Sequence, residues 1–227
     1  MGGQFISASY PPYKGEFATY TAWLYREMMK HDNIHLHLNT ELTAQMVRDG
    51  KPDKVILATG AAPVIPQVPG IQNENVVLAE DVLLGRSDTG MNVLVAGGGM
   101  VGSETAAYLG MQCKSKVTVI EMRDEIALDM EAGIRDDLKD CLNRCYVDIL
   151  TKTSLAGVTA EGALLKRGDT VTLFPCDTVV LAIGTRAFCP LKEELDGICE
   201  TVIVGDAVQA RQAIQASREG FNAGYYA

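Results

Sequence analysis

Apolar residues recur along the first third of the chain with two different periods. Between residues 16 and 30 they return every three or four positions, which predicts a helix. The stretch "NIHLHLN" alternates instead, which predicts a strand with Ile34, Leu36 and Leu38 on one face. His35 and His37 would share the other face, but no carboxylate or thiol follows nearby, so we interpret them as solvent-side residues and expect no metal site. A short strand or turn is expected near Leu42 to Val47.

Two apolar runs resemble each other across a long separation. "VILATG" ends at Gly60 and "VVLAIG" ends at Gly184, and each run follows an aspartate, Asp53 or Asp177, two residues ahead of it. Short apolar runs of this kind are typical of strands buried in a parallel sheet. Three prolines between Pro63 and Gly70 then exclude a helix and favour a fixed crossover between domains, followed by a polar, helix-like stretch as far as about Thr89.

The second half of the chain alternates strands with helices, which predicts an α/β fold with parallel sheets. The expected elements are a strand at 93–96, a helix at 103–109, a strand at 116–120, a helix at 131–144, a strand at 146–151, two or three short strands between 155 and 174, a buried strand at 178–184, a strand from 200 that ends in Gly205 and Asp206, and a helix from about 210. The short strands and the crossover predict small antiparallel additions.

A glycine-rich loop joins the first of these strands to its helix. Gly97, Gly99 and Gly102 form G-x-G-x-x-G, and Glu121 ends the next strand 24 positions after Gly97. The motif alone is weak, but a strand before it, a helix after it and an acidic residue ending the second strand are the context of a dinucleotide fingerprint. In that context, glycines allow a tight turn and a close approach to a pyrophosphate, and the helix N-terminus offers N–H groups to it. The alternative is a packing turn without a ligand.

The residue that ends the second strand bears on which dinucleotide binds. A carboxylate such as Glu121 accepts ribose hydroxyls and repels the 2′-phosphate of NADP. Arg123 could instead pair with that phosphate, so the preference for NADH over NADPH rests on Glu121.

The repeat predicts how the domains are arranged. Gly97 precedes Gly184 by 87 residues, and the same offset from Gly60 gives 60 − 87 = −27, a position before residue 1. We therefore expect nested Rossmann-like domains, the first of which lacks its first β-α-β unit. The expected limits are 1–66 with 200–227 for a partial FAD-binding domain, 67–90 for a linker, and 91–199 for a complete NAD(P)-binding domain.

Charge and composition exclude some classes of binding partner and indicate a cellular compartment. A net charge of −9 and the absence of a basic run argue against nucleic-acid binding. No apolar run is long enough for a membrane span, and no signal-peptide pattern opens the chain. Six cysteines lie without the spacing of a disulfide framework, so we expect a cytoplasmic protein.

Several motifs together resemble the two-dinucleotide-binding-domain flavoproteins, in particular the C-terminal half of the group containing 2,4-dienoyl-CoA reductase, 2-enoate reductase and trimethylamine dehydrogenase. The motifs are "GGGMVGSETA", "ILATGAAP", "VIVGDA", "GGQF" and "ARQAI". The resemblance implies dinucleotide contacts for Gly97, Gly98, Gly99, Met100, Val101, Gly102, Glu104, Glu121, Met122, Arg123, Ile183 and Gly184. It implies flavin contacts for Gly2, Gly3, Gln4, Ala58, Thr59, Gly60, Gly205, Asp206 and Ala213.

The same resemblance implies a reaction. In that group, hydride passes from NADH to FAD, and electrons continue through an iron–sulfur cluster and FMN to an activated C=C bond. The FMN and the cluster belong to an N-terminal barrel that we expect to be missing here, and no dithiol is present for disulfide chemistry. No side chain is assigned as a catalytic acid or base. The alternative from another class is a non-catalytic module that binds ADP or NAD for structure or regulation.

Because the first FAD unit is missing, we expect FAD binding by this chain to be weak or absent. The expected partners are NADH, a flavin and the missing barrel. An apolar face left uncovered could also produce a homo-oligomer. Asp206 has a second interpretation, as the N-cap of the last helix.

Overall fold

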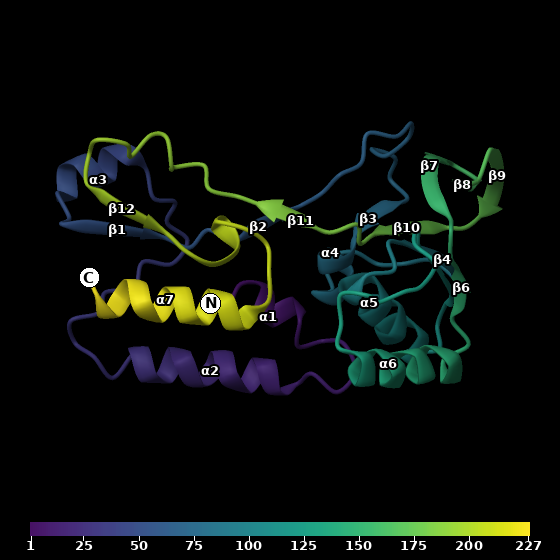
Figure 1. The fold of residues 1–227 in the computed structure, drawn as a ribbon, viewed down its shortest axis with the longest axis horizontal. Helices are drawn as coiled ribbons and strands as arrows, with labels where there is room; N and C mark the ends of the chain where they lie inside the picture. The colour runs from purple at the N-terminus through teal and green to yellow at the C-terminus, as the bar shows by residue number, and fades with distance from the viewer. The chain divides into compact units, whose positions relative to one another are not determined.

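The computed structural model describes residues 1–227, and the chain divides into two compact units (Figure 1). The first unit comprises Met1–Met28 and Ile65–Gly184, and the second comprises Met29–Val64 and Thr185–Ala227. The domain limits expected from the sequence stay a prediction. The α/β class, with parallel sheets and small antiparallel additions, is confirmed.

The first unit is built on a five-stranded parallel sheet. Its strand order is β3-β10-β4-β5-β6. The strands are β3 (Val76–Leu78), β4 (Asn92–Ala96), β5 (Lys116–Ile120), β6 (Asp148–Leu150) and β10 (Thr178–Leu181). From β4 the chain proceeds to β5 and β6 on one side, whereas β10 lies on the other side. Ligands of open α/β sheets bind where the strand order reverses in this way, outside the carboxyl ends of the strands.

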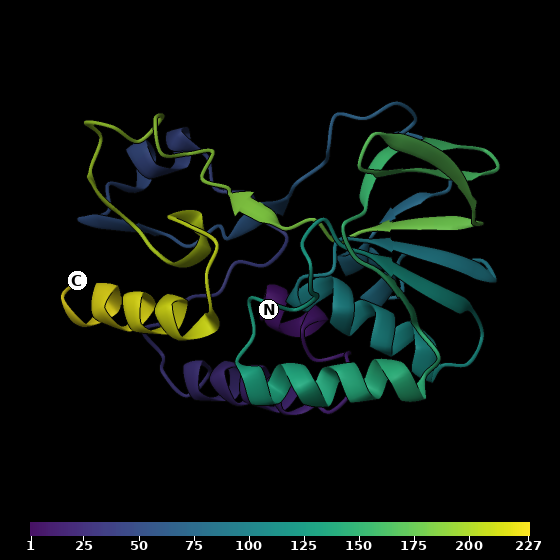
Figure 2. The same cartoon turned by 45° about the vertical axis from the view of Figure 1, so that its right-hand side comes forward.

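Both faces of this sheet are covered, which explains the unbroken apolar runs (Figure 2). Val93 and Val95 pack among the helices, whereas Leu94 and Ala96 pack against a three-stranded antiparallel sheet. The helices are α4 (Ala79–Leu83), α5 (Met100–Met111) and α6 (Ala132–Arg144), and the antiparallel strands are β7 (Ser154–Thr159), β8 (Gly162–Arg167) and β9 (Thr170–Pro175). Alternate residues of a strand thus reach two separate cores.

Two further helices, α1 (Gln4–Ser7) and α2 (Glu16–Met28), open the first unit. They pack through aromatic side chains, with the ring of Phe5 edge-on to that of Phe17 at 5.3 Å between centroids. The predicted helix over 16–30 is therefore confirmed, two residues shorter than expected.

The second unit has two small sheets. Strand β1 (Lys54–Leu57) pairs in parallel with β12 (Glu200–Ile203), and β2 (Ala61–Pro63) pairs antiparallel with β11 (Thr185–Ala187). Its core contains Val55, Leu57 and the fully buried Leu195. The remaining elements are α3 (Ala44–Gly50), the 3-10 turn η1 (Gly205–Ala207) and α7 (Ala213–Tyr225).

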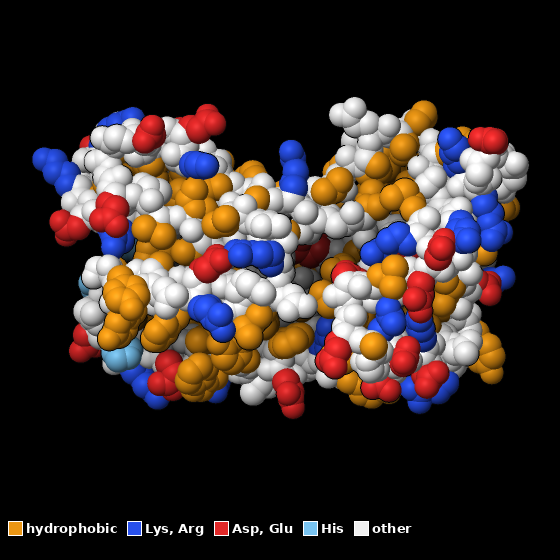
Figure 3. Space-filling model, in the orientation of Figure 1, with side chains coloured by type: hydrophobic (Ala, Val, Ile, Leu, Met, Phe, Trp, Pro, Cys, Tyr) orange, Lys and Arg blue, Asp and Glu red, His pale blue; other side chains and the backbone are white.

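The apolar side of α7 is not buried. None of its residues is buried, and Phe221 and Tyr225 are 69% and 70% exposed. Apolar side chains gather over this helix on the face drawn in Figure 3.

Two expected local structures are wrong, and a third is correct only in part. Residues 34–38 form no strand, because alternation supplies a buried face only when a neighbouring strand pairs with it, and none does. The expected strand or turn at 42–47 is instead α3, which starts where the hydroxyl of Thr43 accepts the N–H of Met46 at 3.2 Å. The stretch before Thr89 was expected to be helix-like, and this holds only for α4, because Val76–Leu78 form β3, whose Val76 pairs with Val179 at the sheet edge.

No helix has the combination of length and hydrophobicity that crossing a bilayer requires. The structure brings together no three His, Cys, Asp or Glu side chains that could hold a metal ion.

Candidate functional site

The loop between β4 and α5 leaves no room for side chains at two of its glycines. Gly97 has φ +110°, and a Cβ there would lie 2.4 Å from the carbonyl oxygen of Ala182. A Cβ on Gly102 would lie 1.9 Å from the carbonyl oxygen of Gly97. Gly97 and Gly102 are therefore glycines because the strand end, the loop and the helix approach one another closely.

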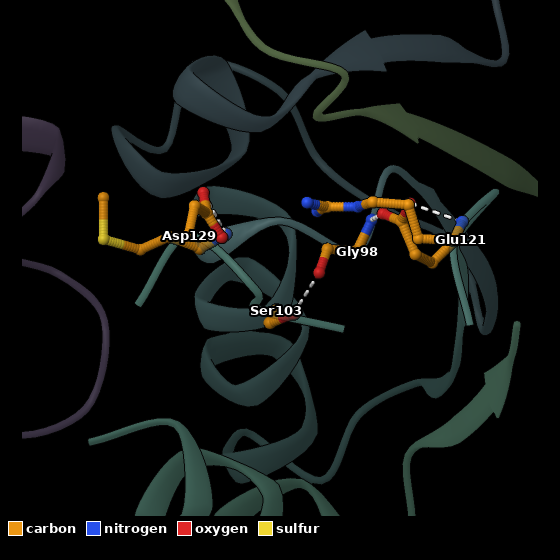
Figure 4. A network of polar contacts seen from close by, with 6 residues as sticks. Gly98, Ser103, Glu121 and Asp129 are labelled. Carbon is orange, nitrogen blue, oxygen red and sulfur yellow. Dashed lines mark hydrogen bonds and ion pairs between the residues drawn. The ribbon is translucent and has the colours of Figure 1, made fainter. Parts of the chain in front are cut away.

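Gly98 makes three hydrogen bonds, and Figure 4 shows those with Glu121 and Ser103. Its N–H donates to Oε2 of Glu121 at 2.8 Å, and its carbonyl accepts from the N–H of Ala127 at 2.7 Å and from the hydroxyl of Ser103 at 3.1 Å. The loop is thus rigidly positioned by the protein itself.

Helix α5 begins in this loop, and its first N–H groups have no partners within the helix. The first intrahelical bond is donated by the N–H of Ser103 to the carbonyl of Gly99. The N–H of Met100 donates to both carboxylate oxygens of Asp129, at 2.9 and 3.0 Å, whereas no protein acceptor contacts the N–H groups of Val101 and Gly102. Two free donors and the positive end of the helix dipole can hold an anion such as a pyrophosphate.

Glu121 stands at the end of β5 and is only 7% exposed. Its Oε1 accepts the N–H of Arg123 at 2.9 Å and the guanidinium Nε at 3.2 Å. Burial alone would raise the pKa of Glu121, but the N–H groups of Arg123 and Gly98, together with the guanidinium, hold that pKa below its usual range. The carboxylate is therefore ionised and fixed in direction. Met122, between the two, is 69% exposed.

Glu104, in the second turn of α5, is paired with a residue from the N-terminal segment. Its Oε1 accepts a hydrogen bond from Nζ of Lys14, and its side chain is 8% exposed. Burial raises the pKa of Glu104 above its usual value, and the contact with Lys14 offsets that only in part. The pair borders a hollow of about 660 Å³ between Pro11–Lys14 and α6.

The end of β10 completes the site. The N–H of Ala182 donates to the carbonyl of Ala96, so Ile183 and Gly184 follow at the same edge of the sheet as the glycine loop. Gly184 has φ +106° and open space where a side chain would be. The structure therefore gathers the predicted dinucleotide residues, which are Gly97 to Gly102, Glu104, Glu121 to Arg123, Ile183 and Gly184, at one sheet edge.

The residues expected to contact flavin are divided between the units. Gly2, Gly3 and Gln4 lie in the first unit, at the start of α1. In the second unit, Ala58, Thr59 and Gly60 follow β1, and Gly205 and Asp206 follow its neighbour β12. Gly60 and Gly205 both have positive φ, +76° and +63°, and the Thr59 hydroxyl donates to the carbonyl of Phe188.

The turn after β12 is closed by contacts within the second unit. The N–H of Gly205 donates to Oε2 of Glu219 at 2.8 Å, and the carboxylate of Glu219 also pairs with Arg211. Asp206 accepts the N–H of Arg211 at 3.1 Å, whereas the N-cap of α7 is Gln212. The N-cap interpretation of Asp206 is therefore wrong, because six residues separate it from Ala213, the first residue of α7.

Three residues of the first-unit site were not found from the sequence: Lys14, Ser103 and Asp129. Ser103 directly follows the glycine motif, so its hydroxyl could have been expected to bond the loop. Lys14 and Asp129 reach the site from 90 and 29 positions away in the chain, and no spacing rule predicts such contacts.

The fold and site define a dinucleotide-binding flavoprotein architecture, and comparison with known proteins agrees. A sequence model of the pyridine nucleotide-disulphide oxidoreductases matches residues 28–207, and the chain belongs to this family of oxidoreductases. It is 32% identical to a metal reductase of Desulforamulus reducens, over 97% of this chain and 38% of the relative. It is 33% identical to an NADH oxidase of Thermoanaerobacter brockii, over 97% of this chain and 35% of the relative.

A solved structure shows the same fold over almost the whole chain. The complex of 2-naphthoyl-CoA reductase with 2-naphthoyl-CoA superposes with a TM-score of 0.91 at 26% identity, over 98% of this chain and 34% of that one. These matches confirm the resemblance to the flavoprotein group named from the sequence. The chain spans little more than a third of the length of each of these proteins.

Proposed function

We propose that this chain is the pyridine-nucleotide and flavin portion of an NADH-dependent flavin oxidoreductase. The observation that carries the proposal is the loop after β4, where glycine is sterically required and where the N–H groups of Val101 and Gly102 face no protein acceptor. Bound NADH would supply a hydride to a flavin. The residues of the chain would bind the dinucleotide, orient it and shield it.

Each group at the sheet edge has a place in this proposal. The α5 N-terminus would hold the pyrophosphate, and Glu121 would accept the adenosine ribose hydroxyls. Glu104 and its partner Lys14 border the hollow in which the far end of the dinucleotide would be shielded. No side chain is needed as an acid or base, because the cofactors carry the chemistry.

We propose a preference for NADH over NADPH. Glu121 is ionised and fixed by two backbone N–H groups, so it presents a negative charge where a 2′-phosphate would lie. The Arg123 guanidinium is engaged by the same carboxylate, so its charge is partly neutralised. An NADH oxidase among the relatives supports this preference.

Flavin binding by this chain alone would be weak. The second unit offers the turns at Gly60 and Gly205 and the carboxylate of Asp206, but the N–H of Gly205 is already bonded to Glu219. We propose that FAD is held in the longer protein, where an FMN- and iron–sulfur-containing barrel would pass electrons to an activated C=C bond of the enoate or dienoyl-CoA type. The solved 2-naphthoyl-CoA reductase supports an unsaturated acyl thioester as the class of acceptor.

The dinucleotide site can be tested with a matched pair of glycine variants. Gly99→Ala adds a methyl group at the expected face of the pyrophosphate, with a φ that alanine adopts, whereas Gly133→Ala adds one in open space on α6. Titration of each protein with NADH, NADPH and ADP by calorimetry should show about ten-fold weaker NADH binding for Gly99→Ala only. Equal NADH affinity in both variants, or tighter binding of NADPH than of NADH, would contradict the proposal.

A second experiment separates hydride transfer from a purely nucleotide-binding role. The chain is mixed with NADH and excess FAD without oxygen, and flavin absorbance is followed with and without protein. Faster bleaching with protein supports the oxidoreductase proposal. Tight NADH or ADP binding without faster bleaching, even in the full-length protein, would instead support a structural or regulatory module.

A further inference from the structure

Asp129 occupies the N-terminus of α5, where the proposed function places a pyrophosphate. Both of its carboxylate oxygens accept the N–H of Met100, at 2.9 and 3.0 Å. An oxygen of the same carboxylate would lie 3.3 Å from a Cβ on Gly99, so it covers the face of the loop that an incoming phosphate must approach. Figure 4 shows Asp129 on this side of the helix, away from Glu121.

Asp129 differs from the other two carboxylates at the site. Glu121 is paired with Arg123 and Glu104 with Lys14, and both are buried. Asp129 is exposed, has no cationic partner, and contacts only the helix N-terminus. Its charge also acts on Glu104, where it adds to the raised pKa. A bound pyrophosphate would thus meet one carboxylate that no cation neutralises.

The segment that carries Asp129 is anchored close by, but not through Asp129. Ala127, two residues earlier, is fully buried and donates its N–H to Gly98 at 2.7 Å. The side chain of Asp129 can therefore leave the helix while the loop stays attached to the sheet edge.

We propose that Asp129 competes with the pyrophosphate of the dinucleotide for the N-terminus of α5. Its carboxylate accepts the Met100 N–H in the free chain and is displaced when the pyrophosphate binds. This inference rests on the proposed dinucleotide site and adds a residue that sets its affinity. The competition favours ligands with two phosphates, because a diphosphate outcompetes a single carboxylate for the helix terminus.

The test compares Asp129→Asn with Glu131→Gln. Asparagine caps a helix as well as aspartate does, so the fold is kept while the charge is removed. Glu131 is an exposed acid two residues further on, and its side chain makes no cap bond, so Glu131→Gln removes the same charge without touching α5. At low salt, Asp129→Asn should bind NADH about five-fold tighter than the unsubstituted chain, and the difference should shrink as salt screens the exposed charge. Glu131→Gln should change the affinity by less than about two-fold.

A second readout follows the competed N–H directly. In ¹⁵N-labelled protein, the Met100 amide resonance should shift both on Asp129→Asn substitution and when NADH binds to the unsubstituted chain. Unchanged or weaker NADH binding by Asp129→Asn, with Met100 unshifted by NADH, would overturn the inference while leaving the site in place. If the unsubstituted chain and both variants all fail to bind NADH, the proposed function itself is wrong and the inference falls with it.

Discussion

The two copies of the strand-and-glycine motif have the same sequence pattern but different surroundings. In β10, Val179 and Val180 are fully buried, because strands flank β10 on both edges and layers cover both of its faces. In β1, the corresponding Ile56 is 38% exposed, and β12 is the single neighbouring strand. Each copy ends in a glycine with positive φ, and the residues that follow, β2 and β11, pair with each other.

The difference shows which properties are local and which are supplied by neighbours. The turn at Gly60 and the turn at Gly184 form alike, because both follow from the residues at the strand end. Burial does not repeat, because it comes from the flanking strands and covering layers, and the glycine loop does not repeat either, because only β10 has one beside it. A matched substitution in each copy therefore measures the contribution of the surroundings.

The largest expected difference is between Val180→Asp and Ile56→Asp. Val180 is fully buried, so an unpaired carboxylate there should lower the free energy of unfolding by about 4 kcal/mol or more. Ile56 is exposed on one side, so the same change should cost about 1 kcal/mol. Urea unfolding followed by circular dichroism measures both, and the fluorescence of Trp23, the sole tryptophan, reports on the first unit. Equal losses would show that a second surface, such as another copy of the chain, covers β1 in solution.

The next prediction concerns Glu104 on α5, the helix that follows the glycine loop beside β10. Lys14→Met leaves the buried carboxylate of Glu104 without its cation. The loss should be about 2 kcal/mol, below the ~3–5 kcal/mol of a fully buried pair because Lys14 is partly exposed.

Two variants control for this interpretation. Lys166→Met, on the exposed part of β8, should be nearly neutral. The double variant Lys14→Met with Glu104→Gln should recover most of the lost stability, because no buried charge remains. A double variant as unstable as Lys14→Met would show that Lys14 acts through packing, not through the charge of Glu104.

A smaller difference is expected between the two aspartates that precede the copies. Asp177 accepts the N–H of Asn92 at 2.7 Å and its side-chain amide at 3.2 Å, which ties β10 to β4. No such contact is made by Asp53, which is exposed. Asp177→Ala should therefore lower the free energy of unfolding by about 1 kcal/mol, and Asp53→Ala by less than about 0.5 kcal/mol. Thermal unfolding of the two variants distinguishes them, and a larger loss for Asp53→Ala would contradict the comparison.

The elements of the first unit could be predicted because its apolar runs are short, regular and punctuated by turns. The run at 93–96 and the run at 116–120 became β4 and β5 almost to the residue. The alternation at 34–38 misled because strand pairing depends on a distant partner, which sequence spacing does not contain. The start of α3 has a local signal that the sequence interpretation missed, because threonine at position 43 is a favoured N-cap residue.

The candidate site was predictable only as far as the motif extends. The glycines and Glu121 follow from local geometry, since the loop, the helix and the second strand lie consecutively in the chain. Lys14 and Asp129 come from outside the motif and are placed by tertiary packing. The contacts that set the charge at this sheet edge therefore could not be predicted from the sequence.

The smallest expected effects are opposite pH dependences in the two units. Burial raises the pKa of Glu104 above its ordinary value of 4.5, so the folded chain holds that proton more tightly than the unfolded chain. Its contribution to stability therefore falls as pH rises from 4.5 through the raised pKa. The pKa of Glu219 is lowered instead, because the N–H of Gly205 and the guanidinium of Arg211 donate to it. Its contribution is present above 4.5 and is lost as pH falls through the lowered pKa.

Thermal unfolding midpoints of Glu104→Gln and Glu219→Gln, measured from pH 3 to pH 8, resolve the two contributions. Relative to the unsubstituted chain, Glu104→Gln should gain stability as pH rises above about 4.5, because glutamine keeps the contact with Lys14 without a buried charge. Glu219→Gln should lose stability at neutral pH and approach the unsubstituted chain in acid. Difference curves of the same sign for both variants would contradict the assignment, because they would mean that burial and hydrogen bonding do not dominate at the residues where the structure places them.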